Sequence, residues 1–212
     1  MAQVRPYRGV EAAQRLADRR RQFIEAGLDL LGAPAENGAL PELTVRAACR
    51  QAGVATRYFY EAFTDKDQFV GAVFDTVIAE LAATTQAAVA AAPAAEQNRA
   101  GMANIVHTIA ADARIGRLLF SAQLSNAVVA AKRAESGVLL ATLYSHEIGT
   151  ALHINRAERT SQKGMATAHF AVGGVGQTIS AWLAGDFTLE PEELIDQLAA
   201  ILDAFTDPRL HG

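Results

Sequence analysis

The chain has 212 residues, of which 50% are hydrophobic, 20% are charged and 7% are aromatic, and its net charge at pH 7 is −4. A chain of this length and composition can bury a hydrophobic core, so it is neither collagen-like nor intrinsically disordered. The single cysteine, Cys49, excludes a disulfide framework and a multi-cysteine metal site.

The spacing of apolar residues predicts helices along nearly the whole chain. Apolar side chains recur three and four positions apart, and no run of β-branched residues alternates with polar ones. We therefore expect an all-α fold of about nine or ten helices, without an internal repeat. The predicted helices cover residues 12–32, 45–52, 56–63, 64–92, 96–111, 114–121, 123–152, 163–185 and 191–205.

Capping residues predict where several of these helices begin and end. Thr44 is a suitable N-cap for the second helix. Gly53 follows that helix at the point where its C-terminus needs the left-handed conformation, which glycine adopts without steric cost. Thr64 is expected to open the fourth, longest helix, with Asp67 as its capping partner three residues on.

The segment from Thr44 to Phe63 has the pattern of a helix-turn-helix, in which a short helix is followed by a tight turn and at once by a second helix. In DNA-binding proteins this geometry lets the second helix enter the major groove while the first braces against the backbone. A small structural hairpin with partly buried aromatic residues would show the same pattern. The second helix carries side chains that suit base edges and phosphates: Thr56, Arg57, Tyr58 and Tyr60.

Charge is distributed unevenly, and its sign near the N-terminus favours a nucleic-acid partner. The first 66 residues hold ten Lys and Arg against eight Asp and Glu, whereas the rest hold nine against fifteen. Lys66 lies in the first turn of the predicted long helix, where the helix dipole disfavours a cation unless an anion such as a phosphate joins it. An ordinary solvated helix face and a tolerated surface lysine would explain the same observations.

The sequence of this hairpin resembles the DNA-reading head of the TetR (tetracycline-repressor-like) family of transcriptional regulators. The resemblance rests on Leu43-Thr44-Val45-Arg46, on Gln51-Ala52-Gly53-Val54 and on the run FYEAFTDKDQF from Phe59 to Phe69. Beyond this head, the helical remainder matches the family only in size and layout. Members of the family are homodimers that bind palindromic operators and usually repress transcription until a small ligand enters the C-terminal domain. The resemblance implies the same for this chain.

The resemblance also implies roles for single residues. It places Tyr60 and Lys66 on phosphates, Thr44 and Arg46 against the DNA backbone, and Arg57 and Tyr58 on bases or adjacent phosphates. Four alanines depart from the family pattern, because they stand where an acidic capping partner, a large aliphatic residue, a serine N-cap and a backbone-contacting side chain are usual. These are Ala47, Ala48, Ala55 and Ala62.

Ahead of the first predicted helix, Arg5 and Arg8 form a basic arm. We expect this arm to lie in the adjacent minor groove, with a disordered tail as the alternative. The chain is accordingly divided into two parts. Residues 1–66 are predicted to be the arm and the helix-turn-helix DNA-binding domain, and residues 67–212 a helical domain for ligand binding and dimerisation.

The last two predicted helices are interpreted as a dimer surface. Small residues in the first allow backbones to approach closely, and the second carries an apolar stripe at helical spacing. Two such hairpins related by a two-fold axis would form a four-helix bundle and place two helix-turn-helix units on successive DNA turns. An ordinary intramolecular core would show the same stripe. The interface candidates are Gly173, Gly176, Ile179, Trp182, Leu183, Leu194, Leu198 and Leu202.

The middle helices supply candidates for a ligand pocket with apolar walls and a few polar groups, which suits a drug-sized molecule or metabolite. No histidine lies at a metal-ligand spacing, so we expect no metal and no cofactor. The N-terminal segment lacks the apolar core of a secretory signal, and polar residues interrupt the most apolar stretch, 165–185, which favours a cytoplasmic protein that does not span a membrane. The pocket candidates are Phe74, Met102, His107, Leu119, Phe120, Gln123, Leu124, Leu140, Tyr144 and His169.

Together these patterns predict a homodimeric DNA-binding regulator, a repressor that a small-molecule effector releases from a palindromic operator. The long helix that starts near residue 64 would couple the pocket to the helix-turn-helix. A transcriptional activator would share these sequence features. The rival from another class is a helical-bundle enzyme or small-molecule carrier with a merely structural helix-turn-helix. No paired carboxylates, activated nucleophile or phosphate-binding loop supports an enzyme.

Overall fold

The computed structural model describes residues 7–34, 43–151 and 162–205, and within these ranges it contains nine α-helices, one short 3₁₀ turn and no strand. The predicted all-α fold is confirmed. The helices are α1 (Tyr7–Leu31), α2 (Val45–Ala52), α3 (Thr56–Ala62), α4 (Lys66–Ala91), α5 (Gln97–Ala111), α6 (Ala113–Phe120), α7 (Ala127–Ala151), α9 (Gln162–Ala184) and α10 (Pro191–Ala204), with the 3₁₀ turn at Ala94–Glu96.

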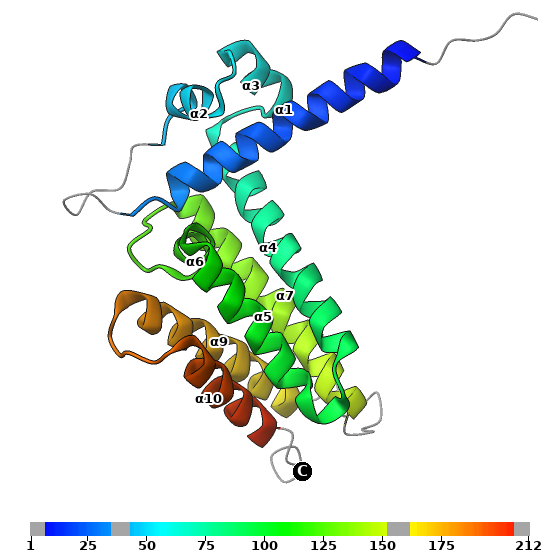
Figure 1. Ribbon diagram of the computed structural model, residues 1–212, viewed down its shortest axis with the longest axis vertical. Helices are drawn as coiled ribbons and strands as arrows, with labels where there is room; N and C mark the ends of the chain where they lie inside the picture. The colour runs from blue at the N-terminus through cyan, green and yellow to red at the C-terminus, as the bar shows by residue number, and fades with distance from the viewer. Residues whose placement is uncertain (1–6, 35–42, 152–161, 206–212) are drawn as a thin grey trace, which may run out of the picture.

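The helices form a head and a body (Figure 1). Helix α1 lies across the top of the view, and the short helices α2 and α3 pack on it. Helix α4 runs downward from this head into the body, where it packs against α5 and α7. Helices α9 and α10 complete the lower part of the body, α9 against α7 and α10 against α5. Helix α6 packs against both α1 and the body.

Most helix ends lie where the capping residues predict them. Thr44 caps α2 through its hydroxyl, which accepts a hydrogen bond from the Ala47 N–H at 3.0 Å. The start of α4 is a correction, because its N-cap is Asp65 and not Thr64. The Asp65 carboxylate accepts from the Gln68 N–H at 2.8 Å, and a carboxylate satisfies a free helix N–H as well as a hydroxyl does. Helix α1 also starts earlier than predicted, because residues 10–22 are mostly strong helix formers.

The buried side chains form two clusters. The first joins head and body: it includes Phe23 of α1, Phe59 of α3 and Val73 of α4, together with residues of α2, α6 and α7. The second lies lower in the body and joins α5, α9 and α10. The first cluster runs across residue 66, so head and body share one core. The division into residues 1–66 and 67–212 stays a prediction.

Helix α4 is the one described helix that is long and apolar enough to cross a membrane, judged by length and composition alone. Burial in the protein core explains the apolar composition of α4. Phe69, Val70, Val73, Phe74 and Val77 of this helix are all buried in the first core cluster.

Candidate nucleic-acid interface and cavity

The helix-turn-helix has the local geometry that its sequence predicts. Gly53 ends α2 with φ 66°, and its N–H and that of Val54 donate to the carbonyls of Arg50 and Cys49. This left-handed residue reverses the chain, so that α3 can begin three residues later at Thr56. Ala55, the N-cap of α3, has no side-chain hydrogen bond, so α3 starts without the cap that a serine would provide.

An aromatic cluster holds α3 in place. Phe59 has 0% of its surface exposed. Its ring centroid lies 5.6 Å from that of Phe23 of α1 and 5.5 Å from that of Phe69 of α4. Phe63 lies 5.1 Å from Phe69 and 6.0 Å from Phe23. These edge-on pairs add specific geometry to the burial of large apolar surfaces. Arg20 of α1 closes the cluster, because its guanidinium lies over the Phe63 ring and donates to the Ala62 carbonyl.

The outward side of the head carries most of the predicted DNA contacts. Thr56 and Arg57 in α3 are exposed, and 59% of Tyr60 is exposed. Arg46 on α2 and Lys66 at the first position of α4 are exposed as well, and Lys66 makes no ion pair with a described carboxylate. All five side chains can donate a hydrogen bond and three of them are cationic, so this surface suits a polyanion. That they contact DNA stays a prediction, and the half-buried Thr44 already uses its hydroxyl as a helix cap.

Tyr58 lies between two guanidinium groups. Arg19 of α1 lies 4.3 Å and Arg57 lies 4.5 Å from the centroid of its ring, and Arg57 Nη2 donates to the Tyr58 hydroxyl at 2.5 Å. Arg19 also pairs with Glu61 of α3 at 3.5 Å. The ring is therefore half-buried in a stack that fixes both arginines on the outward side of the head. Sequence reasoning missed the role of Arg19, although the run of arginines at 19–21 just ahead of Phe23 signals a basic helix face.

The predicted N-terminal arm differs from the structure. Arg8 belongs to α1, which is helical from Tyr7 onward, so this part of the chain is not an extended arm in a minor groove. The strong helix formers from Glu11 onward extend the helix back over this segment, although Gly9 is a weak helix former. Arg5 lies outside the described residues.

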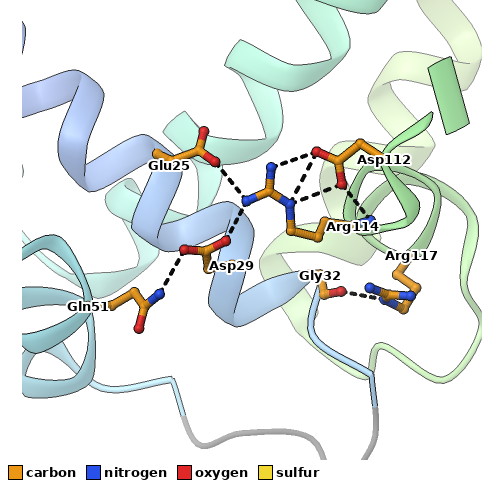
Figure 2. A network of polar contacts seen from close by, with 7 residues as sticks. All are labelled: Glu25, Asp29, Gly32, Gln51, Asp112, Arg114 and Arg117. Atoms are coloured by element: carbon orange, nitrogen blue, oxygen red, sulfur yellow. Dashed lines mark hydrogen bonds and ion pairs between the residues drawn. The ribbon is translucent and has the colours of Figure 1, made fainter.

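A polar network joins the body to the head (Figure 2). Arg114, at the start of α6, donates to Glu25 at 2.7 Å and to Asp29, both on α1, and to Asp112 at 2.6–3.1 Å. The other oxygen of Asp29 accepts from Gln51 of α2 at 2.7 Å. The chain of contacts thus runs from α6 through α1 to the first helix of the helix-turn-helix. Because Arg114 lies 89 positions from Glu25 and 85 positions from Asp29, no local pattern could reveal the link between α6 and α1.

A close backbone approach lies beside the network. Arg117 of α6 donates to the carbonyl of Gly32, where α1 ends. A Cβ atom at Gly32 would lie 2.6–2.7 Å from the Cα, Cβ and carbonyl oxygen of Arg114, closer than real atoms approach. Glycine is therefore required at this position for α6 to pack on α1.

The network gives stability a defined pH dependence. The pKa of Asp112 is lowered from its ordinary value of 3.8, mainly because the Arg114 side chain donates to its carboxylate. A lowered pKa in the folded state means that ionised Asp112 stabilises the protein above its ordinary pKa, and that this stabilisation is lost as the pH falls through the folded-state pKa. We expect the unfolding free energy of Arg114→Met to fall less steeply than that of the native protein between about pH 5 and pH 2, measured by urea denaturation.

Arg99→Met is the matched control for this prediction. Arg99 also pairs with two carboxylates, Glu192 and Asp196, but all three side chains are exposed. The control should keep the native pH dependence. Equal slopes of unfolding free energy against pH for the native protein and Arg114→Met would contradict the stabilisation of ionised Asp112 by Arg114.

The body contains a cavity of about 1030 Å³. Residues of α4, α5, α6, α7, α9 and α10 line it, and most of them are apolar. Six of the predicted pocket residues lie in its wall: Phe74, Met102, Leu119, Phe120, Leu140 and His169. That they bind a ligand stays a prediction.

Three predicted pocket residues lie elsewhere. His107 is 53% exposed, and its Nε2 lies 2.7 Å from Glu192 Oε1, so the acidic start of α10 holds it at the surface. Gln123 is exposed, and Leu124 packs against the first core cluster. Gln123 and Leu124 lie in the loop between α6 and α7, because α7 starts at Ala127 and not at residue 123 as predicted. For His107, apolar helical spacing does not tell which side of a bundle a residue faces. The side chain of Tyr144 lies outside the described residues.

The predicted dimer residues need a similar correction. Ile179, Leu194, Leu198 and Leu202 are buried in the second core cluster, so they have no surface left for a second copy. Their stripe packs α10 against α5, which is the alternative that the sequence left open. Gly173 and Gly176 line the cavity instead, with nothing within 4 Å of a Cβ atom built on either.

Trp182 and Leu183 are half-buried beside the second core cluster, and the Trp182 indole donates to the Leu189 carbonyl at 3.0 Å. Their contact with a second copy stays a prediction. The exposed apolar residues nearby are Phe170, with 68% of its surface exposed, on α9 and Ile201 on α10.

No protein-family model matches the sequence, and no curated protein is similar to it. Solved structures with the same arrangement of helices do exist. The fatty acid degradation regulator FadR from Bacillus halodurans superposes with a TM-score of 0.65 at 16% identity, over 87% of this chain and 94% of that one.

Two further structures are similar. FadR from Bacillus subtilis, solved in complex with stearoyl-CoA, gives a TM-score of 0.63 at 16% identity, over 86% of this chain and 96% of that one. A TetR-like transcriptional regulator from Rhodococcus sp. RHA1 gives 0.58 at 18% identity, over 92% and 96%. The similarity extends over nearly the whole chain, and the chain has the fold of TetR-like transcriptional regulators.

Proposed function

We propose that the chain is a sequence-specific DNA-binding transcriptional regulator. The observation that carries this proposal is the outward side of the head, where exposed Thr56, Arg57 and Tyr60 of α3 stand beside the exposed Lys66 of α4. A helix of this width enters the major groove, its first turns meet base edges, and flanking cations neutralise phosphates. The solved structures of this fold that are similar to the chain are of transcriptional regulators and not of enzymes, which supports the proposal.

The proposed regulator acts as a homodimer. A two-fold pair of heads matches a palindromic operator with half-sites about one DNA turn apart. The exposed Phe170 and Ile201 support α9 and α10 as the contact between copies, because large apolar groups at a surface favour association. Multi-angle light scattering on the full chain tests this step, and a monomer at operator-binding concentrations would contradict it.

Release by a small molecule completes the proposed function. The cavity borders α6, and α6 is tied to the head by Arg114 and Arg117. A ligand that prefers one position of α6 would change operator affinity by its differential binding, typically about 1–3 kcal/mol. The long acyl chain of stearoyl-CoA in the Bacillus subtilis structure supports an apolar ligand for the cavity here.

The decisive experiment is selection of binding sites from a random duplex library by the purified full chain, followed by affinity measurement at several salt concentrations. We expect an enriched palindrome and a steep fall of affinity with salt. A chain that enriches no sequence and ignores duplex DNA at low salt would overturn the proposal. The alternative, a helical small-molecule carrier with a structural hairpin, predicts that result.

Lys66→Ala should weaken binding to the selected operator and to unrelated duplexes alike. A lysine that neutralises one phosphate contributes about one unit to the slope of log affinity against log salt, so the slope should fall by about one. Fluorescence anisotropy with a labelled duplex measures both quantities. Lys132→Ala removes the same charge from α7, outside the helix-turn-helix, where Lys132 is already paired with Asp75, and should leave the slope unchanged.

A further inference from the structure

Arg133 places a permanent positive charge in the wall of a mostly apolar cavity. It belongs to α7 and is half-buried. Its guanidinium donates to carbonyl oxygens at the C-terminal end of α6: Nη2 to Leu118 at 2.6 Å and to Arg117 at 3.1 Å, and Nη1 to Ser121 at 2.9 Å. Among the described residues no carboxylate pairs with it, and its burial lowers the pKa of the guanidinium.

The carbonyl groups do not fully neutralise the positive charge of Arg133. Dipoles at a helix C-terminus offset only a part of a unit charge, and a cation that is withdrawn from water is stabilised fully by a counter-ion. With the bond from Nε to Leu118, four of the five N–H groups of Arg133 have a described acceptor, which leaves one N–H on Nη1. This remaining N–H can donate one charge-assisted hydrogen bond to a carboxylate.

The cavity is elongated, and its two ends differ in charge. It follows one face of α4 from Phe74 to Val89, a distance of about 22 Å at about 1.5 Å per residue. Arg133 is near the Phe74 end, because the neighbouring Lys132 pairs with Asp75 at 3.0 Å. The far end carries Asp203, which accepts from Asn98. An anion is therefore attracted to one end and repelled from the other.

We propose that the cavity binds a long-chain carboxylate, with its head group on Arg133 and its hydrocarbon chain along the apolar face of α4. This inference rests on the proposed control by a small molecule and specifies the chemical class of that molecule. The hydrocarbon chain would lie along Phe74, Ile78 and Leu81, which belong to the cavity wall. Arg133 donates to carbonyl oxygens at the end of α6, and α6 contacts α1 of the DNA-binding head through Arg114. A carboxylate that binds Arg133 therefore acts on α6 directly.

Three ligands of equal chain length and different charge test the proposal: dodecanoate, dodecan-1-ol and dodecyltrimethylammonium. Each is titrated into the full chain by calorimetry below its micelle-forming concentration. We expect dodecanoate to bind at least tenfold more tightly than the alcohol, and the cation to bind most weakly. Equal affinity for the acid and the alcohol would overturn the proposal, and this comparison needs no variant protein.

Two variants on the same turn of α7 locate the head group. Arg133→Gln should weaken dodecanoate at least tenfold and leave the alcohol within twofold. Lys132→Gln removes an equal charge from a residue outside the cavity wall and should leave both affinities unchanged. Equal losses of dodecanoate binding in both variants would contradict a head group at Arg133. If Arg133→Gln does not fold, the three-ligand comparison still decides.

Operator binding is measured on the same preparations, so that two kinds of failure can be told apart. A chain that binds its selected operator but does not distinguish the three ligands refutes the carboxylate and keeps the regulator. A chain that prefers dodecanoate but binds no DNA refutes the regulator and keeps the carboxylate site. We expect dodecanoate to lower operator affinity at least fivefold in the native protein and not in Arg133→Gln.

Discussion

Phe59→Ala is expected to lower the unfolding free energy by about 3–5 kcal/mol and to abolish operator binding. Phe59 has 0% of its surface exposed and touches rings from α1 and α4 as well as its own helix. Its removal would leave a void among aromatic rings that belong to three helices, and these cannot collapse together around it. Guanidinium chloride denaturation measures the stability, and fluorescence anisotropy measures operator binding.

Tyr60→Ala is the matched control, since it removes an aromatic ring one position along the same helix. The Tyr60 side chain is mostly exposed and has one described ring contact, with Phe59 at 5.4 Å. Its loss should cost less than about 1.5 kcal/mol of stability, while operator binding still weakens because Tyr60 faces outward. Equal stability losses in the two variants would show that the aromatic cluster does not hold the head together.

Gly32→Ala is the second substitution with a large expected effect, and its sign is unusual. Replacing glycine by alanine commonly stabilises a protein by up to about 1 kcal/mol, because the unfolded chain loses freedom. Here the new Cβ would overlap the backbone of Arg114, and overpacking of this kind costs about 1–3 kcal/mol. We expect a net loss of stability in urea denaturation and a weaker operator complex, since α6 must move off α1.

Gly174→Ala makes the same chemical change in the middle of α9. A Cβ at Gly174 meets nothing within 4 Å, and the residue is exposed. This variant should be more stable than the native protein by about 0.5–1 kcal/mol. If Gly32→Ala were stabilised to the same degree, the tight contact between α1 and α6 would not exist in solution.

The parts of the fold that the sequence predicted well are those fixed by local chemistry. Thr44 and Gly53 bound α2 because a hydroxyl cap and a left-handed residue act within one helical turn. The error at the start of α4 is local too: two neighbouring residues, Thr64 and Asp65, are both suitable caps, and only the structure tells which one meets the Gln68 N–H.

The candidate site was harder to predict where tertiary packing decides. The apolar stripe of Leu194 and Leu198 fits an interface between copies and an internal core equally well, and the structure shows the core. His107 lies outside the cavity because Glu192, 85 positions away, holds it. The roles of Arg114 and Arg133 were not predicted for the same reason, since both arginines have acceptors on other helices.

The anchoring of α6 has a consequence for protein engineering. Arg117 and Arg133 hold this helix through main-chain oxygens, which every amino acid supplies, so the attachment does not depend on the side chains of the residues gripped. Phe120, which lines the cavity and is only partly buried, can then be varied while these main-chain attachments are kept. Helix α6 is accordingly the place where a library that reshapes the cavity wall should begin.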